Sequence, residues 1–214
     1  MKLREVFDPA RLEFNAILAR LSVLFEDLRI EEYASRIDGL DQLDDVGKGY
    51  RKIYFLRRSI ATLVEFAGAI EMLDQRPEFR ELKRGFNADC TSRWNESVKY
   101  FIDWKKYLSE IRADFGGHFD HGSARHAIAE MHPETVGELV VVKHDEDKTG
   151  GVRLKYAMEI VGSAMTRPKP ADQEDRTYFH EMFVVVRAGS HMAVRAIHTL
   201  SVVFLLEKFG RDMS

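Results

Sequence analysis

The densest group of chemically active side chains lies between residues 112 and 126. An arginine guanidinium is planar, permanently charged and shaped to match a phosphate group. A histidine imidazole takes and gives a proton near neutral pH. Together they suffice to cleave RNA without a metal, because one removes the 2′-hydroxyl proton and the other stabilises the charge on the phosphate oxygens. The group consists of Arg112, Asp114, His118, His121, Arg125 and His126.

Spacing decides which of these side chains meet. Asp114 and His118 stand four residues apart, so on a helix they share a face and the carboxylate can orient the imidazole. Arg112 and His118 stand six residues apart and do not share a face of an unbroken helix. His118 also follows Ile111 by seven residues, which continues an apolar stripe. A hydrogen-bonded core histidine beside a solvated arginine is therefore an open alternative.

An arginine followed a few residues later by a histidine near the end of a helix resembles the signature of the HEPN superfamily (higher eukaryote and prokaryote nucleotide-binding domains). The resemblance covers about residues 44–132. It implies an α-helical bundle and a metal-independent endoribonuclease of the toxin–antitoxin or defence type, without a cofactor. Arg112 and His118 are then the catalytic pair, with Asp114 and His121 assisting.

The resemblance also implies partners. Members of this family usually act as homodimers with the two signatures facing each other, and toxins of this kind pair with a protein antitoxin. The family favours a polar residue directly after the arginine, where this chain has Ala113. That departure favours a second hypothesis, a non-catalytic module that binds a nucleotide or a protein through the same site.

Further basic residues are candidates for contacting the RNA backbone. On the last apolar segment Arg187 and His191 are four residues apart, and with Arg125 and His126 we predict that they bind substrate. A second basic group stands earlier in the chain, where two tyrosines interleave with it and can stack on bases. This group is Tyr50, Arg51, Lys52, Tyr54, Arg57 and Arg58. Both groups are also compatible with ordinary solvated helix faces.

A metal site is the third hypothesis. His118, His121 and His126 offer nitrogen ligands close together, as a metal-dependent hydrolase requires. The chain has no His-Glu-x-x-His motif and a single cysteine, Cys90, which excludes a cysteine zinc cluster and a disulfide framework.

The elements that position these residues are mainly helical. Apolar residues recur at three-and-four spacing after Asp8-Pro9, again from Asp44 to Pro77, and over about 92–115. Shorter or later helices are expected over 122–131 and about 172–209, and an acidic stretch at 31–43 is expected to be a loop.

One segment changes from helical to strand periodicity. Residues 152–160 alternate apolar and polar side chains, and 139–142 is a plausible partner strand. We therefore predict one domain over 1–214, a bundle of long antiparallel helices with a β-hairpin at about 137–161 before the C-terminal helix. The net charge of −3 gives no global attraction to nucleic acid, and charges interrupt every long apolar run. We expect a cytoplasmic protein with no membrane partner.

Overall fold

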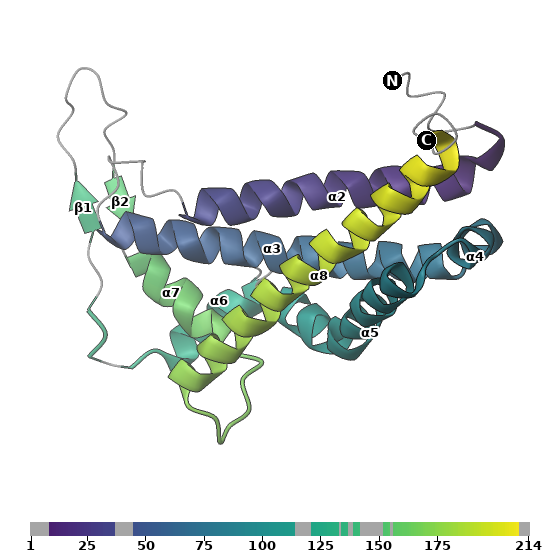
Figure 1. The fold of residues 1–214 in the computed structure, drawn as a ribbon. Coiled ribbons are helices and arrows are strands. Elements are labelled where there is room, and N and C mark those ends of the chain that lie inside the picture. The colour runs from purple at the N-terminus through teal and green to yellow at the C-terminus, as the bar shows by residue number, and fades with distance from the viewer. Residues whose placement is uncertain are drawn as a thin grey trace, which may run out of the picture.

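The computed structural model describes residues 9–36, 45–113, 121–132, 134–136, 139–141, 152–154 and 156–209. Its helices and strands, in chain order, are η1 Pro9–Arg11, α2 Leu12–Arg36, α3 Asp45–Asp74, α4 Pro77–Arg84, α5 Ala88–Ile111, α6 His121–Glu130, β1 Leu139–Val141, β2 Val152–Leu154, α7 Tyr156–Met165 and α8 Asp175–Phe209. The mainly α-helical class predicted from the sequence is confirmed (Figure 1).

Two local signals fix the start of α4 and α5. Pro77 stands at the first position of α4, where its missing N–H costs nothing. Asn87 caps α5, because its side chain accepts a hydrogen bond from the Cys90 backbone N–H at 2.8 Å. The helix predicted from residue 92 therefore begins four residues earlier, at Ala88.

The acidic stretch predicted as a loop over 31–43 is helical as far as Arg36, so that prediction is wrong for residues 31–36. Glu31 is buried, and its Oε1 accepts a hydrogen bond from Thr62 Oγ1 of α3 at 2.9 Å. Arg58 Nε lies 3.8 Å from the same oxygen. Because Glu31 has these partners on α3, the helix can continue through it. Residues 37–43 of the predicted loop lie outside the described residues.

The two longest early helices, α2 and α3, lie side by side (Figure 1). Glu13 pairs with Arg76, and Arg20 Nη1 lies 3.8 Å from Met72 Sδ, whereas Glu31 meets Thr62. As the residue number rises along α2, the number of the contacting residue on α3 falls, so these two helices run in opposite directions. Helix α8 crosses them obliquely and packs on α5 and α3. The antiparallel arrangement of the whole bundle stays a prediction.

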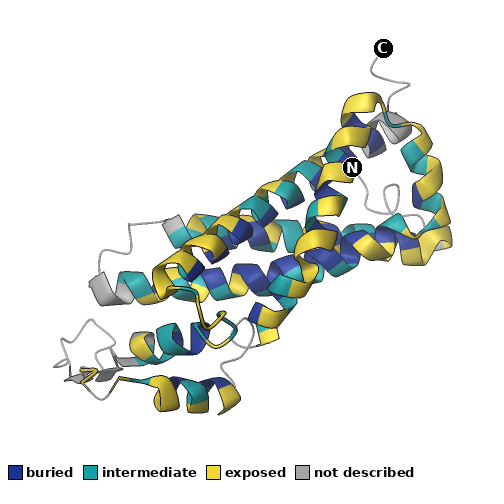
Figure 2. Cartoon of the chain, turned by 90° about the horizontal axis from the view of Figure 1, so that it is seen from below, coloured by how far each residue is buried: buried dark blue, intermediate teal, exposed yellow. Residues whose placement is uncertain are grey.

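The core fills the space where these helices meet. Figure 2 shows buried positions gathered on the facing sides of the long helices, with exposed positions on the outside. The largest fully buried side chains include Trp94, Tyr178, Phe66 and Phe79. Trp94 and Phe79 rings pack 4.7 Å apart between centroids, and Trp94 Nε1 donates to Asp74 Oδ1 at 3.1 Å. These contacts hold α3, α4 and α5 together.

The strand predicted over 152–160 is wrong beyond Leu154. Val152–Leu154 pairs antiparallel with Leu139–Val141, with Leu139 opposite Leu154, but the chain turns helical as α7 from Tyr156. Val161, Ala164 and Met165 are buried, and that spacing belongs to one face of a helix. Helix α7 therefore separates the strands from α8. The predicted connecting loop at 144–151 lies outside the described residues, so the hairpin as a whole stays a prediction.

Among the described helices, none has a stretch both long and apolar enough to cross a membrane.

Candidate nucleic-acid interface

Arg112 lies directly after the last residue of α5, where the helix ends in a wider turn over Arg112 and Ala113. Its Nη2 lies 2.8 Å from Glu65 Oε1 of α3, and its side chain is 41% exposed. The guanidinium is thus held in place by a carboxylate while part of it faces solvent. Asp114 and His118 lie outside the described residues, so the pairing of Arg112 with His118 stays a prediction.

Glu65 binds a second guanidinium as well. Arg20 of α2 forms an ion pair through Nη2 with Glu65 Oε2, the other oxygen of the same carboxylate. The Arg20 side chain is 42% exposed and that of Glu65 is 37% exposed. Two arginines from two helices therefore share one acid from a third, which leaves one net positive charge at this point.

The same face of α3 carries further residues at heptad spacing. Seven residues turn a helix by about 700°, within about 20° of two full turns, so Arg51, Arg58 and Glu65 fall on one side. Tyr54 falls between them and is 47% exposed. Arg51 is buried, so we call the exposed residues Arg20, Tyr54, Arg58 and Arg112 the α3 cation face.

Helix α8 covers the opposite side of α3. Leu63 precedes Glu65 by two residues, which is about 200° around the helix. A Cβ built on Gly189 of α8 would lie 3.0 Å from Leu63 Cδ1, so α8 packs against the Leu63 side. The α3 cation face is therefore directed away from α8.

The predicted residues of α8 lie on that other side. Arg187 and His191 are exposed, and Arg195, one turn after His191, forms an ion pair with Glu96 of α5 at 2.8 Å. Within the described part of the chain no hydrogen bond or ion pair joins Arg187 or His191 to Arg112. Their role in substrate binding stays a prediction.

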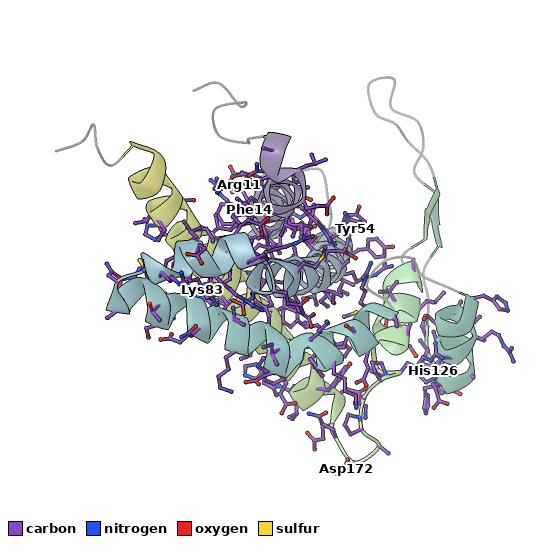
Figure 3. All side chains as sticks on the ribbon, turned by 90° about the vertical axis from the view of Figure 1, so that its right-hand side faces the viewer. Arg11, Phe14, Tyr54, Lys83, His126 and Asp172 are labelled. Atoms are coloured by element: carbon purple, nitrogen blue, oxygen red, sulfur yellow. The ribbon has the colours of Figure 1, made fainter. Side chains whose placement is uncertain are left out.

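Helix α6 carries the other predicted residues. His121 and Arg125 are exposed, whereas His126 is half-buried and its Nε2 is buried without a hydrogen-bond partner. His126 lines a polar cavity of about 590 Å³ between α6, α7 and the start of α8, in which Lys169 Nζ pairs with Asp175 at 3.2 Å. Figure 3 shows that His126 and Tyr54 come from different elements. His126 and the α3 cation face thus belong to different elements.

The metal hypothesis gains no support from the described residues, which contain no group of three or more histidine, cysteine or acidic side chains able to hold an ion. His121 and His126 belong to the described α6, whereas His118 lies outside the described part of the chain.

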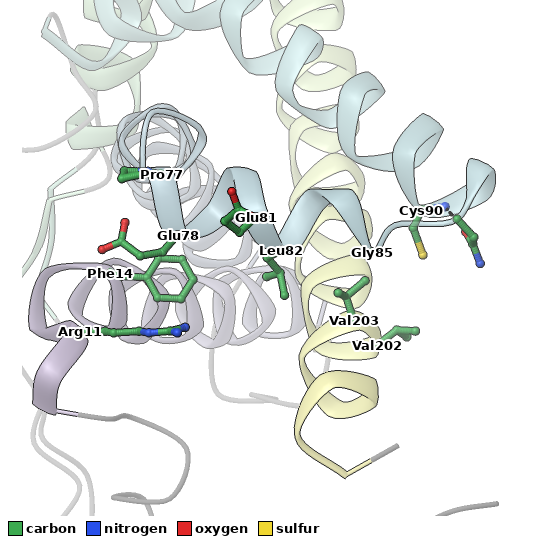
Figure 4. Close-up of a pocket in the computed structure, with 11 residues that line it drawn as sticks. Arg11, Phe14, Pro77, Glu78, Glu81, Leu82, Gly85, Cys90, Val202 and Val203 are labelled. Carbon is green, nitrogen blue, oxygen red and sulfur yellow. Dashed lines mark hydrogen bonds between the residues drawn. The ribbon is translucent and has the colours of Figure 1, made fainter. Parts of the chain in front are cut away.

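A second cavity, of about 720 Å³, lies at the far end of the molecule between η1, α4 and α8 (Figure 4). Phe14, Leu82 and Val203 give it a largely apolar wall, and the buried free thiol of Cys90 lies at its edge. Nothing in the sequence pattern indicated this cavity, because its residues come from four separate segments.

Sequence reasoning also missed Arg20 and Glu65. Arg20 stands among the apolar residues of α2 without a distinctive motif, and Glu65 interrupts the apolar run of α3. The seven-residue spacing of Arg51, Arg58 and Glu65 was the available signal, since it places them on one face.

No family model matches the chain, and no curated protein or solved structure matches it at a significant level.

Proposed function

We propose that this protein binds single-stranded RNA through the α3 cation face. The observation that carries the proposal is the shared carboxylate: Arg20 and Arg112 both pair with Glu65 and both remain about two-fifths exposed. A guanidinium has five N–H donors, so one that donates to a carboxylate keeps others for a phosphate oxygen. The choice of RNA follows from the HEPN resemblance.

Charge and stacking support the same reading. The whole chain carries −3, so attraction to a phosphate backbone has to come from a local excess of positive charge. The α3 cation face provides such an excess, because Arg20 and Arg112 share Glu65, and Arg58, two helical turns before Glu65, is half exposed with its Nε 3.8 Å from Glu31. Tyr54 supplies an exposed ring on the same face, and aromatic rings stack on unpaired bases without regard to sequence.

RNA cleavage is a second candidate function. Arg112 stands at the end of α5, directly before the segment that carries His118, as the HEPN signature requires. In this scheme His118 takes the 2′-hydroxyl proton and the 2′-oxygen attacks phosphorus. The bond from phosphorus to the 5′-oxygen breaks, which leaves a 2′,3′-cyclic phosphate, and the 5′-oxygen takes a proton from water. Arg112 stabilises the negative charge on the phosphate oxygens. Asp114 and His121 assist, and no metal takes part.

One experiment tests both functions. A labelled single-stranded RNA is titrated with protein in EDTA at several salt concentrations, and its integrity is followed on a gel. We expect Arg112→Ala and Arg20→Ala each to weaken binding and to lower the slope of log K against log salt by about one. Arg84→Ala is the control, because Arg84 is 77% exposed and pairs only within α4, with Glu81.

The outcomes separate the hypotheses. Equal binding by wild type and both variants would exclude the α3 cation face as the interface. If wild type cleaves RNA in EDTA, and His118→Ala abolishes cleavage but still binds, the nuclease function is supported. If the RNA stays intact with wild type, only the binding function is supported. The homodimer, the antitoxin partner and the absence of a cofactor stay predictions of the resemblance, and sedimentation of the purified protein tests the first of them.

A further inference from the structure

Arg51 is a buried cation without a partner. The residue is 8% exposed, and Nε, Nη1 and Nη2 are all buried with no hydrogen-bond acceptor. It belongs to α3, two turns before Arg58. Arginine stays protonated in proteins, so this side chain cannot escape its burial by losing a proton.

Such an arrangement is unfavourable by itself. Removing a charge from water costs free energy that an opposite charge or several hydrogen bonds have to return. The buried acid Glu31 lies farther along α3, where its Oε1 accepts a hydrogen bond from Thr62 and lies 3.8 Å from Arg58. It forms no hydrogen bond with Arg51. Within the described residues the Arg51 guanidinium has no such compensation, and an anion that moved into contact with it would supply the missing acceptors.

The sequence around Arg51 defines the charge of that anion. Residues 48–58 contain five basic side chains and no acidic one. Arg57, in the same stretch, has a pKa lowered from its ordinary value because burial disfavours its charged form. A cluster of this kind suits a group with more than one negative charge and several acceptor oxygens better than a single carboxylate.

We infer that Arg51 anchors a binding site for a phosphate group at the N-terminal end of α3. The planar guanidinium donates two parallel N–H bonds to two phosphate oxygens, and the neighbouring basic side chains balance the remaining charge. The phosphate comes either from a free small molecule or from a nucleic-acid backbone. This site does not depend on the RNA-binding proposal, although it extends the same face of α3.

Thermal unfolding tests the inference with inorganic phosphate as the probe, against chloride at equal ionic strength. We expect phosphate to raise the melting temperature of the wild type and to leave that of Arg51→Met unchanged. In phosphate-free buffer Arg51→Met should melt at the same temperature as the wild type or higher, because the variant removes an uncompensated buried charge. Arg84→Met is the control outside the site, since Arg84 is 77% exposed and pairs with Glu81 of α4; it should keep the phosphate response.

An equal response to phosphate in wild type and Arg51→Met would overturn the inference, and so would a wild type that does not respond. Should Arg51→Met fail to fold, the broadening of the phosphorus resonance of inorganic phosphate by wild-type protein gives the answer without a variant, and no broadening would overturn the site.

Parallel titrations with a nucleoside monophosphate and an RNA oligomer identify the source. Stabilisation by free phosphate without RNA binding would reject the proposed function alone, and RNA binding without any phosphate effect would reject this site alone.

Discussion

Arg112 Nη2 lies 2.8 Å from Glu65 Oε1, and this ion pair fastens the end of α5 to the middle of α3. Both side chains are around two-fifths exposed, and ion pairs at that exposure contribute roughly 0–1 kcal/mol to stability. The pair therefore matters more for where the guanidinium points than for the free energy of unfolding. Glu65 also reduces the positive potential that Arg112 and Arg20 present to a polyanion.

Replacing Glu65 with glutamine should therefore strengthen RNA binding. Glu65→Gln removes one negative charge between two arginines while it keeps an oxygen for their N–H groups. We expect tighter binding at low salt and a dependence on salt steeper by up to about one ion. The measurement is a fluorescence titration at several salt concentrations, with Glu81→Gln as the control on α4. Weaker binding by Glu65→Gln at every salt concentration would show that the carboxylate itself positions the arginines for RNA.

The helices were predictable because their apolar residues repeat at the period of the structure that they form. Leu21, Ile60 and Phe101 are buried where the spacing placed them. The errors arose where a local pattern was ambiguous. The alternation over 152–160 is typical of a strand, yet the structure continues from Tyr156 into a helix whose later residues Val161, Ala164 and Met165 are buried at helical spacing.

The candidate site was less accessible to sequence reasoning. The position of Arg112 at a helix end followed from periodicity, but its carboxylate partner depends on how α3 and α5 cross. Likewise, a seven-residue spacing places Arg51 on a face of α3 without revealing that the guanidinium is buried, because burial depends on segments far away in the sequence.

The stability of the protein should depend on pH through Glu31. Burial raises the pKa of Glu31 above its ordinary value near 4.5, although hydrogen bonds from Thr62 and Ser59 oppose the shift. The folded chain then holds this proton more tightly than the unfolded chain does. The contribution of Glu31 to the free energy of unfolding is therefore highest below the ordinary pKa and falls as pH rises through the raised pKa.

Glu31→Gln isolates this effect, since glutamine cannot ionise but still accepts the hydrogen bond from Thr62. We expect the variant to gain stability relative to the wild type as pH rises above about 4.5, and to show no such gain below it. Chemical denaturation across this pH range gives the comparison. Glu26→Gln is the control on the same helix, because Glu26 is 58% exposed. A wild-type advantage that grows with pH would mean that the Arg58 ion pair outweighs burial.

Two half-buried tyrosines should respond oppositely to loss of their hydroxyl groups. The Tyr107 hydroxyl is buried without a hydrogen-bond partner, and burial raises the pKa of Tyr107 to about 12. The Tyr100 hydroxyl instead donates to the Val185 backbone carbonyl, which joins α5 to α8. We expect Tyr107→Phe to leave stability unchanged or raise it by about 1 kcal/mol, and Tyr100→Phe to lower it by about 1 kcal/mol. Denaturant unfolding measures both, and equal effects would contradict the assigned hydrogen bond.

Three glycines inside helices make a last, internally controlled comparison. Alanine is favoured over glycine in a helix interior by about 1 kcal/mol, so a Gly→Ala change stabilises wherever the new methyl group has space. A Cβ on Gly68 of α3 or on Gly162 of α7 would meet nothing within 4 Å. A Cβ on Gly189 of α8 would lie 3.0 Å from Leu63 Cδ1 and 3.4 Å from Tyr100 Cε1, so Leu63 or α8 has to shift by a few tenths of an ångström. Overpacking of this kind costs roughly 1–3 kcal/mol, more than the helix preference returns.

We therefore expect Gly68→Ala and Gly162→Ala to raise the melting temperature and Gly189→Ala to lower it. Stabilisation by Gly189→Ala would show that α8 does not pack this closely on Leu63, and the assignment of the α3 cation face to the side away from α8 would then need to be revised.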